Sequence, residues 1–520
     1  MKIRAGLTSP SRVWEQFLIQ EGLPFGTVDL RNGVSVEDWS VLIVNRRVAA
    51  ADKEAVETYL RSGGAVLAYA GHLPEGRQST TRRERLEYLV SDGTGPFGSV
   101  GLIDLGMHGE IPREANQMRT RQDTFGVFLG SLAGAPACLL PFDPERALSD
   151  FRAADLSFHA KPDRLPSERV SLVGKGGVRR LLHTALESLH TARDLPYVHL
   201  WYYPEGNRTV FAYRVDTDFA PRKDIDDLYA VAKAFAVGMT WFIDVKSHEP
   251  WLGHFASMVG QEFGVHCYEH KVQDEHAANT ANFGRAKRML EAAGFDPAGF
   301  AAPYGIWSPG LGAVIRELGF AYSSEFSCAY DTLPFVPAAD AEFYGPLQIP
   351  IHPISIGSLR RAGYTVNQMK EYFLASADQK IACAEPAFFY HHPTHRCRDV
   401  VESLFGHLRD QGLEPMTLGD FARWWARRGE ASYAAAVEGN VLKFHAADDS
   451  SLSEGGVFVR VVERGGREAV VPIESEIDLG TLQWVEPRKY HTPLDIRKIR
   501  EFDPRRTLGD LYNTMMRKLR

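Results

Sequence analysis

Carboxylates and imidazoles crowd into three short segments in the middle of the chain. In chain order they are Asp216 and Asp218 in RVDTDFA, His266 and His270 in EFGVHCYEHK, and His391, His392 and His395 in YHHPTHR. One Asp and two His form a facial ligand set for a divalent metal, and this set leaves positions open for water and substrate. A second carboxylate and a further His are then available as base and acid. Each segment alone also fits a turn or a core residue, but their joint occurrence favours a metal-dependent site.

The spacing within these segments indicates how the groups are presented. The i, i+4 spacing of His266 and His270 predicts two imidazoles on one face of a helical turn that follows a short strand. Pro303, Tyr304 and Gly305 predict a tight turn whose backbone N–H groups can face a cleft. Trp307 follows that turn and could stack on a sugar ring.

The elements around these residues alternate between strands and helices. Apolar runs predict strands at 209–215, 239–243, 263–266, 300–302, 322–324, 348–351 and 387–391, and amphipathic patterns predict helices at 224–235, 280–293, 309–318, 365–377, 399–411 and 418–427. Six or seven such repeats over about 196–430 imply a barrel of parallel strands, complete or distorted. The candidate residues all lie at the C-terminal ends of these strands, where such barrels build their active sites.

The order and wording of these segments resemble the polysaccharide deacetylase (NodB-homology) family of metal-dependent amide hydrolases. The matching pieces, spread over about 209–428, are RVDTD, GMTWFI, EFGVHCYEH, APYG and YHHP. The resemblance implies an α/β fold with a distorted (β/α)7 barrel. It also implies a divalent metal, with Zn first and Co, Ni, Mn or Fe as alternatives. The implied reaction removes an N-acetyl or related acyl group from a sugar or glycoconjugate precursor.

The resemblance also implies a role for each matching residue. Asp218, His266 and His270 match the metal ligands, Asp216 matches the catalytic base, His392 matches the general acid, and the backbone N–H of Tyr304 matches the oxyanion contact. The expected substrate-binding residues are Tyr304, Trp307, His391 and His395. The roles of Asp216 and Asp218 could be exchanged, and His391 is the alternative to His392.

One position departs from the family pattern. The Arg that usually pairs with the base is replaced by Ala301, and Arg214 is one candidate for the missing cation. If no cation replaces it, a degenerate, non-catalytic carbohydrate-binding barrel is an alternative. A second alternative is an allantoinase-like hydrolase of the same fold that opens cyclic amides.

Three further regions flank the predicted barrel. Residues 1–150 predict a doubly wound, flavodoxin-like α/β domain, with strands at 41–44 and 65–69 and a helix at 52–61 between them. The stretch SGGAVLAYAG in this region resembles the glutamine-amidotransferase-like fold, but no Cys precedes Cys138, so we expect the domain to be non-catalytic. Residues 151–195 form a connection with one helix at 178–189, and 431–520 predict a small β-rich domain with a basic helical tail.

Composition restricts the class of protein further. The 520 residues are 44% hydrophobic and 24% charged with a net charge of -7, which excludes a disordered or collagen-like chain and gives no general reason to bind nucleic acid. The five scattered cysteines contain no CxxC pair and fit free thiols in a reducing compartment. The longest uncharged stretch, 127–142, is too short to span a bilayer. We therefore expect a cytoplasmic protein, a possible homo-oligomer, whose partner is its N-acetylated substrate.

Overall fold

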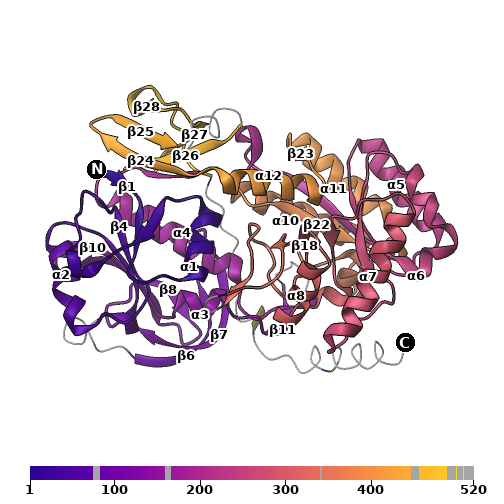
Figure 1. The fold of residues 1–520 in the computed structure, drawn as a ribbon, viewed down its shortest axis with the longest axis horizontal. Coiled ribbons are helices and arrows are strands. Elements are labelled where there is room, and N and C mark those ends of the chain that lie inside the picture. The colour runs from indigo at the N-terminus through magenta and orange to yellow at the C-terminus, as the bar shows by residue number, and fades with distance from the viewer. Residues whose placement is uncertain are drawn as a thin grey trace.

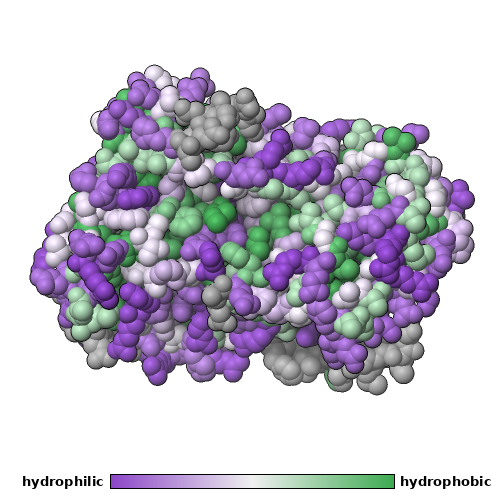
Figure 2. Space-filling view, in the orientation of Figure 1, coloured by the Kyte–Doolittle hydropathy of each residue, from purple (hydrophilic) through white to green (hydrophobic). Residues whose placement is uncertain are grey.

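The computed structural model describes residues 1–73, 82–158, 165–339, 342–446, 456–488, 499–500 and 508. The chain forms two lobes, one built from the first part of the sequence and one from the middle part (Figure 1). A small set of late strands, β24 to β28, lies over the first lobe (Figure 1). Polar side chains cover much of the viewed face, with apolar residues interspersed near the junction of the lobes (Figure 2).

The second lobe is built on a curled parallel sheet with the strand order β21-β18-β17-β16-β15-β14-β22. Its strands are β14 (Val210–Asp216), β15 (Thr240–Asp244), β16 (Glu262–Cys267), β17 (Gly299–Phe300), β18 (Tyr322–Ser323), β21 (Leu347–Gln348) and β22 (Ala387–His391). The two ends of this sheet approach each other, since the His352 N–H donates to the Phe388 carbonyl at 2.8 Å. The parallel α/β sheet is thus confirmed, although in the described residues strand pairing does not close it into a full barrel.

Helices follow these strands, and all but the last of them pack on the outer face of the sheet. They are α5 (Arg222–Phe235), α6 (Val245–His248), α7 (His276–Ala292), α8 (Pro309–Glu317), α9 (Ile356–Arg361), α10 (Val366–Ala382), α11 (Arg398–Asp410) and α12 (Leu418–Glu430). Helix α8 begins as predicted, with Ser308 Oγ accepting the Leu311 N–H at 3.2 Å and Pro309 in the first position. The short helices α6 and α9 are not among the sequence predictions.

The first lobe contains a mixed nine-stranded sheet with the order β3-β2-β4-β5-β10-β9-β8-β6-β7. Its strands are β2 (Ala5–Leu7), β3 (Phe25–Thr27), β4 (Val41–Val44), β5 (Val66–Tyr69), β6 (Arg82–Val90), β7 (Leu102–Ile111), β8 (Gln117–Thr120), β9 (Phe125–Leu132) and β10 (Ala135–Leu140). Its helices are α1 (Arg12–Glu21), α2 (Lys53–Arg61), α3 (Pro144–Leu148) and α4 (Lys175–Thr191). The predicted strand-helix-strand unit β4-α2-β5 is present and parallel. The sheet departs from a doubly wound one because β6 to β9 are antiparallel.

Strands from distant parts of the chain share two further sheets. One sheet joins β1 (Lys2–Ile3) to β24 (Tyr433–Glu438), β25 (Val441–Ala446) and β28 (Glu476–Asp478), and another joins β13 (Tyr197–Leu200) to β26 (Phe458–Val462) and β27 (Glu468–Pro472). The predicted β-rich character of 431–520 is seen in these strands, with β26 and β27 paired antiparallel. Most of the predicted helical tail lies outside the described residues. The boundaries at 150, 195 and 430 remain predictions. Among the described residues, no helix combines the length and apolarity needed to cross a membrane.

Candidate metal centre

Side-chain alternation on β14 and β22 determines which groups face the interior of the curled sheet. On β14, Phe211, Tyr213 and Val215 belong to the core under the helices, whereas Ala212 belongs to the core inside the sheet. Because successive strand residues point to opposite faces, Arg214 and Asp216 share the inner face with Ala212.

The same alternation on β22 separates the two adjacent histidines. Phe389 lies in the core under the helices, so His391 shares that outer face, whereas Tyr390 lies in the inner core and His392 follows on the inner side. His391 is buried, with 1% of its surface exposed. This placement favours His392 over His391 as the residue that reaches the site.

Three ligand atoms converge at the C-terminal edge of β14 and β16. The Oδ1 atom of Asp218 lies 3.1 Å from His266 Nε2 and 3.1 Å from His270 Nε2, and the two Nε2 atoms are 3.1 Å apart. Ligand bonds of about 2.0–2.1 Å in a tetrahedral zinc site place neighbouring ligand atoms roughly 3.3 Å apart. The spacing of the three atoms therefore fits one divalent ion.

The hydrogen bonds around these atoms also fit a cation. The Nδ1 of His266 lies 2.6 Å from the Ala301 carbonyl oxygen, so Nδ1–H donates to that oxygen and the lone pair of Nε2 faces the cluster. Asp218 Oδ1 is buried without a hydrogen-bond partner among the described atoms. A buried carboxylate oxygen in this state is costly unless a cation satisfies it.

The prediction that His266 and His270 share a helical turn is wrong. His266 lies in strand β16, and His270 lies in the loop beyond it. The strand extends to Cys267 because that residue pairs with Asp244 of β15. The loop then folds back because Asn282 of α7 accepts the Glu269 N–H at 2.7 Å and donates to the Glu269 carbonyl at 2.9 Å.

Asn282 is a site residue that the sequence analysis missed. Its side chain also accepts the Tyr268 N–H at 3.1 Å and donates to the Lys271 carbonyl at 3.1 Å. These four hydrogen bonds to the backbone of residues 268–271 hold the loop that carries His270. An Asn inside a predicted helix was the only sequence signal for this role.

Asp216 is held by a buried cation on its own strand. Arg214 donates from Nε to Oδ1 at 2.7 Å and from Nη2 to Oδ2 at 2.6 Å, and it also donates to the Ser324 carbonyl. The side chains are 0% and 4% exposed. Arg214 thus supplies the cation that Ala301 cannot, and the two-residue spacing along one strand places both groups on one face.

His392 and His395 lie beside this cluster. His392 Nε2 is 3.4 Å from Asp218 Oδ2, and the rings of His392 and His395 are 4.8 Å apart. Burial lowers the pKa of His395 to about 3, so this imidazole is neutral at physiological pH. Burial raises the pKa of Asp218, but the facing His392, His266 and His270 outweigh that effect and bring the pKa well below its ordinary value.

Two exposed aromatic rings flank His270 at the edge of the site. Tyr304 is 53% exposed and Phe219 is 63% exposed, and their rings lie 5.0 and 5.2 Å from the His270 ring. Both residues have positive φ, +60° and +54°. Non-glycine residues rarely adopt this backbone conformation, and those that do often lie at functional sites.

Trp307, which was predicted to stack on a sugar, is 5% exposed and packs against Phe151 with ring centroids 4.5 Å apart. Its predicted sugar-stacking face is covered by protein.

Comparisons with known proteins give matches at the level of structure. No protein-family model matches the chain. No curated protein matches it either. Similar solved structures include a probable polysaccharide deacetylase from Pseudomonas aeruginosa PAO1, at 18% identity over 44% of this chain and 93% of that chain, with a TM-score of 0.35. A family 4 carbohydrate esterase from Streptomyces lividans matches at 14% identity over 40% of this chain and 91% of that chain, with a TM-score of 0.28.

Puue allantoinase matches at 16% identity over 43% of this chain and 93% of that chain, with a TM-score of 0.35. The comparisons give no support to the amidotransferase-like resemblance of 62–71.

Proposed function

We propose that this protein is a metal-dependent hydrolase that removes an N-acetyl or related acyl group from a sugar or glycoconjugate precursor. The observation that supports this proposal is the convergence of Asp218, His266 and His270 beside the salt-bridged Asp216 and the inward-facing His392. These groups supply a ligand set, a base and an acid at one edge of the sheet. The free state of the five cysteines supports a reducing, cytoplasmic setting for this activity.

Each of these residues would have a separate role in amide hydrolysis. Asp218, His266 and His270 would hold a divalent ion, with zinc first, which when bound lowers the pKa of water towards ~7 and polarises a carbonyl. Asp216 would accept the proton of the attacking water, and the bidentate contact with Arg214 orients this carboxylate. The backbone N–H of Tyr304 would donate to the developing oxyanion. His392 would donate a proton to the nitrogen of the leaving amine.

The geometry also bears on the non-catalytic alternative. Ala301 was the feature that favoured a degenerate barrel, because it removes the motif cation. The bidentate contact of Arg214 with Asp216 restores a cation beside the carboxylate. That contact favours the catalytic proposal.

Metal content and acyl release test the proposal together. We expect about one divalent ion per chain in the wild type and its loss in His266→Ala, with His276→Ala, an exposed His of α7, as the matched control. Asp216→Asn should retain the ion and lose acetate release from N-acetyl sugars by about 10²-fold or more, since it removes the base and leaves the three ligand residues in place. Absence of metal after reloading with Zn²⁺ would reject the mechanism. Turnover of a cyclic ureide with none of N-acetyl sugars would favour the allantoinase-like alternative.

A further inference from the structure

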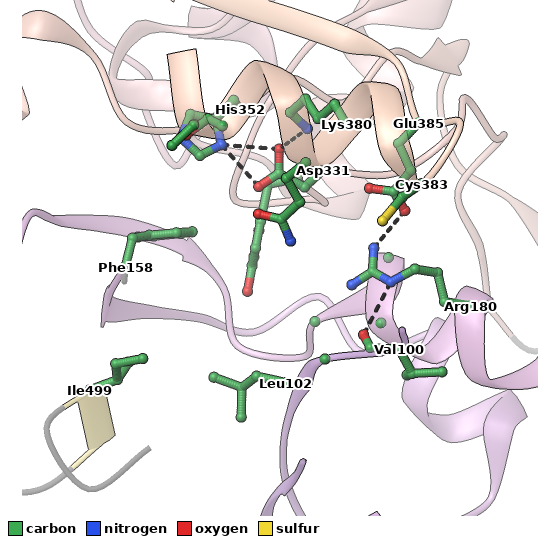
Figure 3. Close-up of a pocket in the computed structure, with 18 of the residues that line it drawn as sticks. Val100, Leu102, Phe158, Arg180, Asp331, His352, Lys380, Cys383, Glu385 and Ile499 are labelled. Carbon is green, nitrogen blue, oxygen red and sulfur yellow. Dashed lines mark hydrogen bonds and ion pairs between the residues drawn. The ribbon is translucent and has the colours of Figure 1, made fainter. Parts of the chain in front are cut away.

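A cavity of about 460 Å³ lies between α4 and α10, away from the candidate metal centre. One wall comes from the start of α4 and the neighbouring strand β7, and the other comes from α10 and the segments that precede it (Figure 3). None of Asp218, His266 and His270 lines it. Its volume falls within the ~300–1,000 Å³ that is typical of small-molecule sites.

Most charged side chains that line the cavity are already in ion pairs, and Figure 3 shows those of Asp331 and Arg180. The pairs are Asp331 with Lys380 and with His352, Arg180 with Glu385, and Arg500 with Asp104, with closest N–O distances of 2.6–3.0 Å. Among the described lining residues, this leaves only the exposed Glu371 without an ion pair. Glu371 is exposed and screened by water, so a charged ligand group would enter without a buried counterion, which is costly in a partly buried site. The lining therefore favours a neutral ligand.

Aromatic side chains supply the apolar surface of the cavity. Phe158, Tyr330, Tyr364 and Tyr372 all line it. Phe158 and Tyr330 contact each other edge to face, with ring centroids 5.5 Å apart, and Tyr372 is fixed by a 3.0 Å hydrogen bond between its hydroxyl and His352 Nε2. Rigid aromatic faces with polar tips suit a ring-shaped ligand that has one apolar face and polar edges.

One hydroxyl in this wall lacks a partner. Tyr364 is 7% exposed, and its hydroxyl is buried without a hydrogen-bond partner among the described atoms. Burial raises the pKa of Tyr364 to about 12, so the group stays a neutral hydroxyl at physiological pH. The hydroxyl has almost no accessible surface in this arrangement, so a ligand reaches it only when the Tyr364 ring turns towards the cavity that the residue lines. A hydrogen bond from the ligand then satisfies the hydroxyl.

We propose that this cavity is a second binding site, distinct from the metal centre, for an uncharged sugar. The paired charges disfavour ionic ligands, and the aromatic wall accepts the apolar face of a pyranose ring. The Tyr364 hydroxyl bonds a sugar hydroxyl once its ring turns into the cavity. The site brings together residues of the first lobe, such as Arg180, and residues of the second, such as Asp331. Its occupant therefore contacts both lobes at once.

Calorimetric titration of the full chain with glucose, N-acetylglucosamine and cellobiose tests the proposal. Glucuronate and glucosamine serve as the charged counterparts, and at least one neutral sugar should bind about tenfold or more tightly than both. Tyr364→Phe, which removes only the hydroxyl, should weaken that binding about three- to tenfold. Ala375→Trp, at an exposed lining position of α10, should abolish it, while Ala292→Trp at the exposed end of α7 should leave it unchanged.

A sugar that binds at the metal centre would give a different pattern. His266→Ala disturbs that centre, so binding in the cavity should persist in this variant even if the proposed hydrolase activity is absent. Binding that is lost in His266→Ala but kept in Tyr364→Phe and Ala375→Trp would overturn the proposal. So would equal affinity for the charged sugars, or no binding of any neutral sugar at 10 mM. If Ala375→Trp does not fold by circular dichroism, Tyr364→Phe decides the question.

Discussion

At the scale of single residues, the contact between Arg214 and Asp216 gives the sharpest prediction. Both side chains are buried, and Arg214→Met leaves Asp216 as a buried charge without its partner. We expect a loss of about 3–5 kcal/mol in the free energy of unfolding. The double variant Arg214→Met/Asp216→Asn should recover much of this loss, because the amide carries no charge. Chemical denaturation of the three proteins measures the difference.

A surface ion pair provides the control for that comparison. Arg222 and Asp226 form a pair in α5 whose side chains are 59% and 46% exposed. Arg222→Met should change the free energy of unfolding by less than about 1 kcal/mol, since exposed pairs contribute little. An equally small effect of Arg214→Met would show that the buried pair does not depend on its charges.

At the scale of elements, β16 positions His266 because the strand lies very close to β15 and β17 at Gly264. A Cβ on Gly264 would lie 2.6 Å from the Phe242 ring of β15 and 2.8 Å from the Gly299 carbonyl of β17. Gly264→Ala therefore pushes β16 away from both flanking strands. We expect a loss of about 1–3 kcal/mol in stability and weaker metal binding, because His266 moves with its strand. Metal titration and denaturation measure the two effects.

Gly253→Ala is the matched substitution for this test. No atom lies within 4 Å of its added Cβ, and its φ is not in the left-handed region. It should leave both stability and metal binding nearly unchanged. Normal metal affinity in Gly264→Ala would indicate that the position of His266 is set by its own contacts and not by its strand.

The elements also show why part of the site was predictable from sequence. Apolar runs such as 209–215 and 387–391 identified strands, and the alternation of buried residues then placed Asp216 and His392 on the inner face. The loop after His266 was misassigned because Asn282, which holds it, is distant in sequence and acts through main-chain hydrogen bonds. The antiparallel strands β6 to β9 were missed because their sequences mix Arg, Glu and Gly with the apolar residues, which blurs the strand pattern.

At the scale of the whole molecule, the beginning and the end of the chain are structurally joined. Lys2 and Ile3 of β1 pair with β24, and β13 pairs with β26 along four residues. The late strands thus complete sheets that earlier segments begin. Pairing between residues more than 250 positions apart carries no local sequence signal, so residues 431–520 were expected as a domain of their own.

Arg428 connects α12 to the end of β13 and to α1. Its buried guanidinium donates to the carbonyls of Trp201, Leu200 and Ile19 at 2.8, 3.0 and 3.2 Å. It also lies over the Trp425 ring at 4.6 Å. A lysine keeps the charge but lacks the planar fork, so Arg428→Lys cannot serve all three carbonyls.

We expect Arg428→Lys to lower the free energy of unfolding by about 2–4 kcal/mol, because buried carbonyls lose their donors and a buried charge loses hydrogen bonds. Arg423→Lys, in the exposed pair with Asp420 on the same helix, should have an effect below about 0.5 kcal/mol. Calorimetry should also show the lobes beginning to unfold separately in Arg428→Lys, since α12 no longer holds α1 and β13. A single thermal unfolding transition at the wild-type temperature in Arg428→Lys would contradict this prediction. It would indicate that strand pairing, and not Arg428, makes the lobes unfold together.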